Sequence, residues 1–150
     1  MIWKKTITTS PTETEKVGKE LAIAMTSDST LPPFIAFFGD LGVGKTAFTR
    51  GFVSVLSPTS AVRSPTFALV NEYRGGSRPI FHFDMYRIED EDDLYSIGFY
   101  DYLDRGICLV EWSENIPFAL PCEYLRVAIE KTDNQTDERI ITIERIEKSC

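Results

Sequence analysis

Residues 39–46, Gly-Asp-Leu-Gly-Val-Gly-Lys-Thr, match the phosphate-binding pattern G-x-x-x-x-G-K-[ST] at every fixed position. Glycines in this pattern let the backbone wrap around phosphate oxygens with its N–H groups exposed. Lys45 is placed to reach the β- and γ-phosphates of a nucleotide, and the Thr46 hydroxyl to bind Mg²⁺. The remaining predicted contacts in the loop are Leu41, Gly42, Val43 and Gly44. The sequence therefore predicts a nucleotide-phosphate site with Mg²⁺.

A nucleotide hydrolase of this class also needs a carboxylate at the end of a neighbouring strand, which holds Mg²⁺ directly or through water. Glu111 follows the apolar run 107–110, and Asp84 follows the run 80–83. Both are candidates for this carboxylate, and Glu111 follows the more typical apolar strand. The alternative for either acid is a strand-end carboxylate that caps a helix or pairs with Arg87.

Two further side chains could assist at this site. Thr66 lies in the Ser-Pro-Thr segment at 64–66, where its hydroxyl could contact the γ-phosphate or the metal; an ordinary strand entry explains the segment equally well. His82 is the only histidine in the chain, and strand alternation places it on the same face as Asp84. An indirect role at the site is open to His82, although packing within the sheet is the more common role of such a residue.

The phosphate loop must be held between a strand and a helix, and its flanks have both patterns. The run 34–38 is apolar throughout, which indicates a strand buried on both faces of a parallel sheet. Apolar side chains at helical spacing predict a helix over residues 45–57. Upstream, Ser10 and Glu13 have the spacing of a capping box, with a proline between them, and predict a helix that ends in the polar cluster 26–30.

The remaining segments complete a mixed sheet. Alternating and β-branched residues predict strands over 2–8, 66–73, 79–84, 107–110, 124–130 and 139–146, the second and third forming a hairpin. A predicted helix over 90–103 is apolar almost all round, so it is either deeply buried or faces a partner, and we favour a partner. The order of elements predicts a three-layer α/β fold of the P-loop NTPase type, with a mixed parallel and antiparallel sheet flanked by helices.

Composition limits the classes of protein. The 150 residues suit a single domain over 1–150. The net charge is −7, five acids are contiguous at 89–93, and no basic stripe is present, which argues against binding driven by a nucleic-acid backbone. The spacing of Cys108, Cys122 and Cys150 fits neither a disulfide framework nor a zinc site, so we expect reduced thiols in a cytoplasmic protein. The apolar runs are too short for a signal peptide or a membrane span.

Four motifs occur in a fixed order: GDLGVGKT at 39–46, SPTF at 64–67, HFDMYR at 82–87 and LVEW at 109–112. With these motifs, residues 10–125 resemble the TsaE family, the small bacterial ATPases of tRNA threonylcarbamoyladenosine (t6A) biosynthesis. The resemblance implies ATP hydrolysis with Mg²⁺ in the cytoplasm, together with the TsaB–TsaD pair. In that system TsaD transfers the threonylcarbamoyl group to A37 of tRNA. The ATPase is expected to reset the complex between turnovers and to meet tRNA only through it.

The resemblance also implies roles for individual residues at the phosphate end. Lys45 and Thr46 match the phosphate-loop lysine and the Mg²⁺-binding threonine of the family. Glu111 matches the metal-site glutamate, and Trp112 matches the aromatic residue beside it. Position 43 is Val where many relatives have a smaller residue; because backbone N–H groups do the binding there, we expect no consequence.

Three more residues are carried over from the family. Asp84 matches an aspartate that the family needs for activity, and Thr66 matches a switch-like threonine near the phosphates. The adenine is expected near the start of the first helix, where Pro11 is the residue we carry over. This last match is looser than the others.

Other nucleotide-binding classes remain as alternatives. A small-molecule kinase usually has an arginine-rich lid over the phosphates, and the chain has no arginine-rich segment. A small GTPase needs N-K-x-D and D-x-x-G motifs, and neither occurs in the chain. A non-catalytic nucleotide-dependent regulatory module would not need the two strand-end carboxylates. The kinase and the regulatory module are the alternatives to an ATPase that we retain.

Overall fold

The computed structural model describes residues 1–39, 44–63, 65, 69–133 and 137–150. The strands within these residues are β1 (Ile2–Thr8), β2 (Phe34–Phe38), β3 (Val70–Tyr73), β4 (Ile80–Asp84), β5 (Ile107–Glu111), β6 (Glu123–Lys131) and β7 (Arg139–Glu147). The helices are α1 (Pro11–Ser27), α2 (Lys45–Leu56), α3 (Glu91–Ser96) and α4 (Phe99–Tyr102), with short 3₁₀ turns at Ser113–Asn115 and Pro117–Ala119. The 3₁₀ turns are absent from the sequence prediction.

All of these strands form one sheet in the order β1-β7-β6-β2-β5-β4-β3. β2 pairs in parallel with both β5 and β6, and β4 pairs in parallel with β5. The pairs β1–β7, β6–β7 and β3–β4 are antiparallel. The predicted mixed α/β sheet is therefore confirmed, and its parallel centre brings the carboxyl ends of β2, β4 and β5 to one edge.

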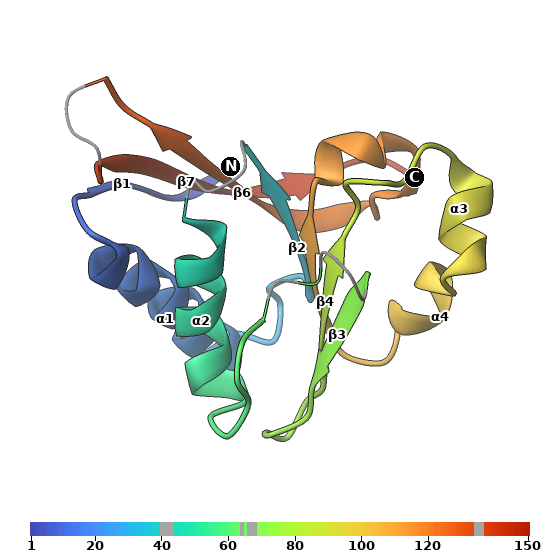
Figure 1. Ribbon diagram of the computed structural model, residues 1–150, viewed down its shortest axis with the longest axis horizontal. Helices are drawn as coiled ribbons and strands as arrows, with labels where there is room; N and C mark the ends of the chain where they lie inside the picture. Colours follow the sequence, from blue (N-terminus) through green and yellow to red (C-terminus); the bar gives the residue numbers. More distant parts are fainter. Residues whose placement is uncertain (40–43, 64, 66–68, 134–136) are drawn as a thin grey trace.

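Helices cover both faces of the sheet, which gives three layers (Figure 1). α1 and α2 lie side by side on one face, and α3 and α4 lie on the other. The side chains divide accordingly into two clusters. Leu21, Phe48 and Phe52 pack on Leu109 and other strand residues in the first cluster. The second cluster joins Leu94 and Phe99 to the opposite faces of the same strands.

α1 and α2 approach each other unusually closely. A Cβ atom at Gly51 of α2 would collide with the backbone carbonyl oxygen of Glu15 on α1. A Cβ atom at Gly18 of α1 would likewise collide with the carbonyl oxygen of Phe48 on α2. Because close packing leaves no room for even one methylene here, these glycines set the distance between the helices. Both helices begin at the same edge of the sheet (Figure 1).

The predicted capping of α1 is confirmed in part. The Ser10 hydroxyl oxygen accepts the N–H of Glu13 at 3.1 Å. The Glu13 carboxylate reaches back one residue further than a capping box requires, and accepts the N–H of Thr9 at 2.8 Å. A complete capping box occurs instead at the acidic run, where the side chains and backbone N–H groups of Asp90 and Asp93 bond reciprocally.

The prediction of one helix over 90–103 is wrong. The segment forms α3 and α4, separated at Gly98, whose φ of 70° lies in the left-handed region that glycine adopts readily. Leu94 and Phe99 are fully buried in the second cluster, whereas Tyr95 is 65% exposed. Burial therefore accounts for much of the apolar character of this segment, and its contact with a partner stays a prediction.

Two other sequence predictions need correction. The strand predicted over 66–73 begins at Val70, because Leu69 has a φ of 66° and is not extended; residues 66–68 lie outside the described residues. The cysteines are not all reduced, since Cys122 and Cys150 form a disulfide and Cys108 is buried and free. The β6–β7 register pairs Glu123 with Glu147, and this brings the residue before Glu123 close to the segment after Glu147. The spacing of the cysteines in the sequence does not reveal this proximity.

Among the described residues, none of the helices combines the length and the apolar character needed to cross a membrane.

Candidate nucleotide and metal site

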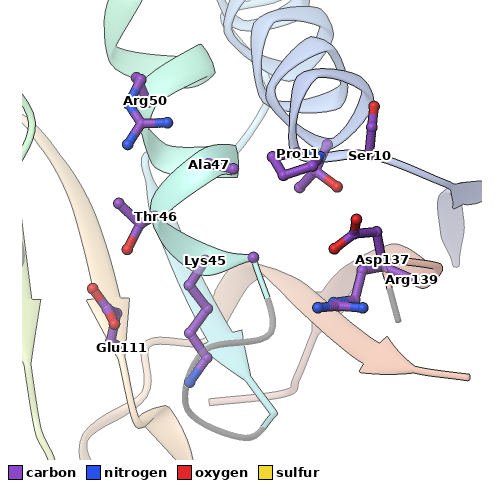
Figure 2. Close-up of a pocket in the computed structure, with 11 residues that line it drawn as sticks. Ser10, Pro11, Lys45, Thr46, Ala47, Arg50, Glu111, Asp137 and Arg139 are labelled. Carbon is purple, nitrogen blue, oxygen red and sulfur yellow. The ribbon is translucent and has the colours of Figure 1, made fainter. Parts of the chain in front are cut away.

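A pocket of about 560 Å³ opens at the edge of the sheet where α1 and α2 begin (Figure 2). Its lining comes from four parts of the chain: the start of α1, the start of α2, the end of β5, and the β6–β7 connection with the first residue of β7. The lining residues are Ser10, Pro11, Thr14, Gly44, Lys45, Thr46, Ala47, Arg50, Glu111, Asp137 and Arg139. Segments far apart in sequence therefore meet at one cavity.

The phosphate end of the pocket is built by the first residues of α2. Gly44 precedes the helix with a φ of 112°, a conformation that favours glycine. Lys45 is 4% exposed, and its Nζ donates to the Gly39 carbonyl oxygen at 2.8 Å. The same ammonium lies 4.9 Å from the centroid of the Trp112 ring. The positive end of α2 and a restrained lysine therefore face the position expected for phosphates. The predicted contacts Leu41, Gly42 and Val43 lie outside the described residues.

Glu111 and Asp84 end two neighbouring parallel strands, and the β4–β5 register pairs them directly. Both are buried, at 8% and 6% exposure. Asp84 Oδ1 accepts the N–H of Tyr86 at 2.9 Å. Asn115, in the 3₁₀ turn after β5, donates through Nδ2 to the carbonyl oxygens of Met85 and Tyr86. The two predicted carboxylates therefore lie together, and the chain after Asp84 is fixed by hydrogen bonds.

The residues at this end suit Mg²⁺ chemically. Figure 2 shows the hydroxyl of Thr46 directed towards the Glu111 carboxylate across the pocket. Mg²⁺ prefers hard oxygen ligands and is commonly held by one or two protein groups together with nucleotide phosphates and water. The described residues contain no cluster of three or more His, Cys, Asp or Glu that could hold a metal without such help. Thr46 and Glu111 thus fit a metal that arrives with a nucleotide.

His82 contacts Glu111, so packing within the sheet is not its whole role. Its Nε2 lies 2.6 Å from Glu111 Oε2, and its Nδ1 lies 3.1 Å from the Tyr73 hydroxyl. Burial is the largest influence on Tyr73 and raises the pKa of its phenol, so the hydroxyl keeps its proton at neutral pH. Alternation along β4 predicts only that His82 lies on the same face as Asp84; the contact with Glu111 also requires the pairing of β4 with β5.

The opposite end of the pocket contains Ser10 and Pro11, where adenine is expected. Asp137 and Arg139 face them from the β6–β7 connection (Figure 2). Sequence reasoning missed both of these residues, because they belong to no motif and reach the pocket only through the β6–β7 hairpin. Thr66, the remaining predicted site residue, lies outside the described residues.

The chain is similar to known proteins over most of its length. The family model described as "Threonylcarbamoyl adenosine biosynthesis protein TsaE" matches residues 8–141. A relative from Bacillus subtilis (strain 168), named "tRNA threonylcarbamoyladenosine biosynthesis protein TsaE", is 41% identical over 137 residues, which cover 90% of this chain and 81% of the relative. A protein of the same name from Rickettsia bellii (strain RML369-C) is 33% identical over 146 residues, with 95% and 96% coverage.

A solved structure is also similar. The crystal structure of Bacillus subtilis YdiB superposes with a TM-score of 0.72 and 33% identity, over 95% of this chain and 86% of that chain. The residues matched by the family model include both ends of the pocket, from Ser10 to Arg139.

Proposed function

This chain belongs to the TsaE family, and from that premise we propose that it binds and hydrolyses ATP with Mg²⁺ in tRNA t6A biosynthesis. It does so in the cytoplasm with TsaB and TsaD, and its ATPase cycle resets their complex between turnovers. The observation that carries the proposal is the meeting of Lys45, Thr46 and Glu111 at one pocket, with Asp84 in register beside Glu111.

In this proposal the triphosphate lies at the start of α2, against Gly44 and the backbone of the loop before it. Lys45 is close to this position already, and exchanges its bond to the Gly39 carbonyl oxygen for phosphate oxygens. Thr46 and Glu111 hold Mg²⁺, which when bound supplies positive charge that offsets the negative charge of the transferring phosphoryl group. The buried position of Glu111 strengthens its interactions because water screens them little.

Asp84 is the group we assign to ordering the attacking water, with Thr66 as its expected helper. Asp84 Oδ1 is already engaged by the Tyr86 N–H, which fixes the orientation of the carboxylate. Glu111 has one oxygen occupied by His82, so its remaining capacity suits a metal better than a proton-accepting role. A water held by Asp84 would receive its orientation from a side chain that is itself restrained.

The nucleoside lies at the other end, between Pro11 on α1 and Arg139 on β7. Recognition of tRNA is left to the partner proteins, since the chain has a net charge of −7 and its acids 89–93 would repel a phosphate backbone. The test is ATP turnover by the purified protein alone, with TsaB–TsaD, and with TsaB–TsaD and tRNA. We expect turnover that depends on Mg²⁺ and formation of t6A that depends on this chain. A chain that neither binds nor hydrolyses ATP under any of these conditions would overturn the proposal.

A further inference from the structure

His82 occupies a position between the candidate metal site and the antiparallel edge of the sheet. It lies on β4, is 1% exposed, and both of its ring nitrogens have partners. Glu111 lies on one side of the ring and Tyr73, on β3, lies on the other. A buried imidazole that contacts a carboxylate with one nitrogen and a hydroxyl with the other is suited to orient that carboxylate.

The donor and acceptor capacities of the two groups decide the direction of the hydrogen bond between His82 and Glu111. An ionised carboxylate is only an acceptor, so His82 Nε2 must carry the proton in its 2.6 Å contact with Glu111 Oε2. On the other side of the ring, the Tyr73 hydroxyl lies 3.1 Å from Nδ1 and contacts it. Tyr73 therefore restrains the His82 ring in the orientation that presents Nε2 to Glu111.

Tyr73 is itself held in place by the backbone. Its hydroxyl oxygen accepts the N–H of Arg63 at 3.2 Å, and its O–H donates to the Arg63 carbonyl oxygen at 3.0 Å. Tyr73 is 4% exposed, and its ring centroid lies 6.0 Å from that of His82. The contacts thus run from the backbone of Arg63 through the buried side chains of Tyr73 and His82 to the buried Glu111.

The structure assigns to His82, supported by Tyr73, the role of a positioning residue that fixes the Glu111 carboxylate for metal binding. Oε2 is occupied by His82, which leaves Oε1 of Glu111 for the pocket side. Partners of this kind, which hold a metal ligand in orientation, commonly change metal affinity by about 10-fold to 100-fold. The inference rests on the proposed function, because it assumes that Glu111 binds the metal that accompanies ATP.

The first experiment measures Mn²⁺ affinity, by the paramagnetic signal of free Mn²⁺, for the protein bound to a non-hydrolysable ATP analogue. We expect His82→Leu to weaken Mn²⁺ binding by about tenfold or more. His82→Gln should recover most of the loss, because its amide nitrogen can replace Nε2 as a donor to Glu111. Nucleotide affinity without metal should stay within about twofold of the native value in both variants.

Tyr73→Phe provides a variant that keeps the ring and its packing and removes only the hydroxyl. We expect it to weaken Mn²⁺ binding by about threefold, and Tyr124→Phe, a buried tyrosine of the second cluster, to leave it unchanged. If His82→Leu does not fold, Tyr73→Phe and His82→Gln decide the question. Native Mn²⁺ affinity in a folded His82→Leu protein, or in Tyr73→Phe, overturns the inference.

A second readout needs neither metal nor activity. Because the chain has only one histidine, its imidazole resonances can be assigned directly by NMR in the nucleotide-free protein. We expect a slowly exchanging Nε2–H, shifted downfield by a carboxylate hydrogen bond, that is lost in Glu111→Ala. An Nδ1–H tautomer, or an Nε2–H unchanged in Glu111→Ala, contradicts the assignment. If Glu111→Gln binds Mn²⁺ with native affinity, the proposed metal site is wrong. If Glu111→Gln loses Mn²⁺ binding while the His82 and Tyr73 variants keep native affinity, only the positioning role is wrong.

Discussion

The two ends of the pocket are built in different ways. At the phosphate end, Lys45 is 4% exposed and Glu111 8%, and Asp84, at 6%, lies in register beside Glu111 although it does not line the pocket; Thr46 is the exposed member of this end. The nucleoside end is formed by Ser10, Pro11, Asp137 and Arg139, of which Pro11 and Asp137 are exposed and the other two are half-buried. Buried polar groups are tightly restrained by their hydrogen bonds, whereas exposed ones interact through a screening solvent.

This difference has a functional meaning. Chemistry at the γ-phosphate requires groups held within a narrow range of positions, and buried strand ends provide that. Contacts to a nucleoside can be weaker and more variable without loss of catalysis. We therefore expect substitutions at the phosphate end to cost far more than substitutions at the nucleoside end.

Asp84→Asn should lower ATP turnover, with ATP binding kept, more than any other substitution at this site except Glu111→Gln. The amide oxygen still accepts the Tyr86 N–H, so the fold is kept while the charge that orders water is lost. We expect ATP turnover to fall by about 100-fold or more, measured by phosphate release at saturating ATP. Asp101→Asn, at an exposed position of α4, should leave turnover unchanged. Normal turnover in Asp84→Asn would remove the assigned role.

Lys45→Ala tests the phosphate contact. Hydrogen bonds to charged groups contribute about 1.5–3 kcal/mol, so ATP affinity should fall by about 10-fold to 150-fold, measured by isothermal titration calorimetry. Lys19→Ala, an exposed lysine on α1, is the matched control and should bind ATP normally. Unchanged affinity in Lys45→Ala would contradict a nucleotide site at the start of α2.

Gly51→Ala tests the packing that brings the two ends together. The added methyl group meets the carbonyl oxygen of Glu15, so α1 and α2 must separate. We expect the free energy of unfolding to fall by about 2 kcal/mol, measured by urea denaturation, and ATP binding to weaken as Pro11 moves away from Lys45. Ser54→Ala, on the exposed face of α2, should change stability by less than about 0.5 kcal/mol. Equal stabilities for Gly51→Ala and the native protein would mean that the helices are not in close contact.

Arg139→Ala should have the smallest effect. Its side chain is half-buried at the pocket rim, where exposed charge interactions contribute about 0–1 kcal/mol. ATP affinity should fall by no more than about fivefold, and turnover at saturating ATP should stay unchanged. Arg105→Ala, an exposed arginine just before β5 and so away from the pocket, is the control and should leave both unchanged. A loss as large as that of Lys45→Ala would abolish the contrast between the two ends.

The same contrast explains which parts of the site could be predicted from sequence. The phosphate end follows local rules: a glycine-rich loop before a helix, and acids directly after apolar strands. Lys45, Thr46, Glu111 and Asp84 could therefore be named from spacing alone. The contact of His82 with Glu111 depends on the parallel pairing of β4 with β5, which no local pattern specifies.

The β6–β7 side of the nucleoside end and the disulfide were not predictable for a related reason, whereas Pro11 was predicted from the resemblance. Arg139, and Cys122 with Cys150, reach their positions through the pairing of β6 with β7, and their side chains follow no motif. The division of residues 90–103 into two helices depends on one residue, Gly98, whose left-handed conformation overrides a helical pattern on both sides. Fold class follows from the order of elements, whereas such breaks and long-range contacts follow from tertiary packing.

Glu111→Gln gives the most direct test of a metal-dependent ATPase at this pocket. ATP affinity and turnover should be measured on the same preparation, with Glu147→Gln, an exposed acid at the far end of β7, as the control. We predict that turnover falls at least about 100-fold while ATP affinity stays within a few-fold of the native value. Native turnover in Glu111→Gln would contradict the assignment of the catalytic metal to the end of β5.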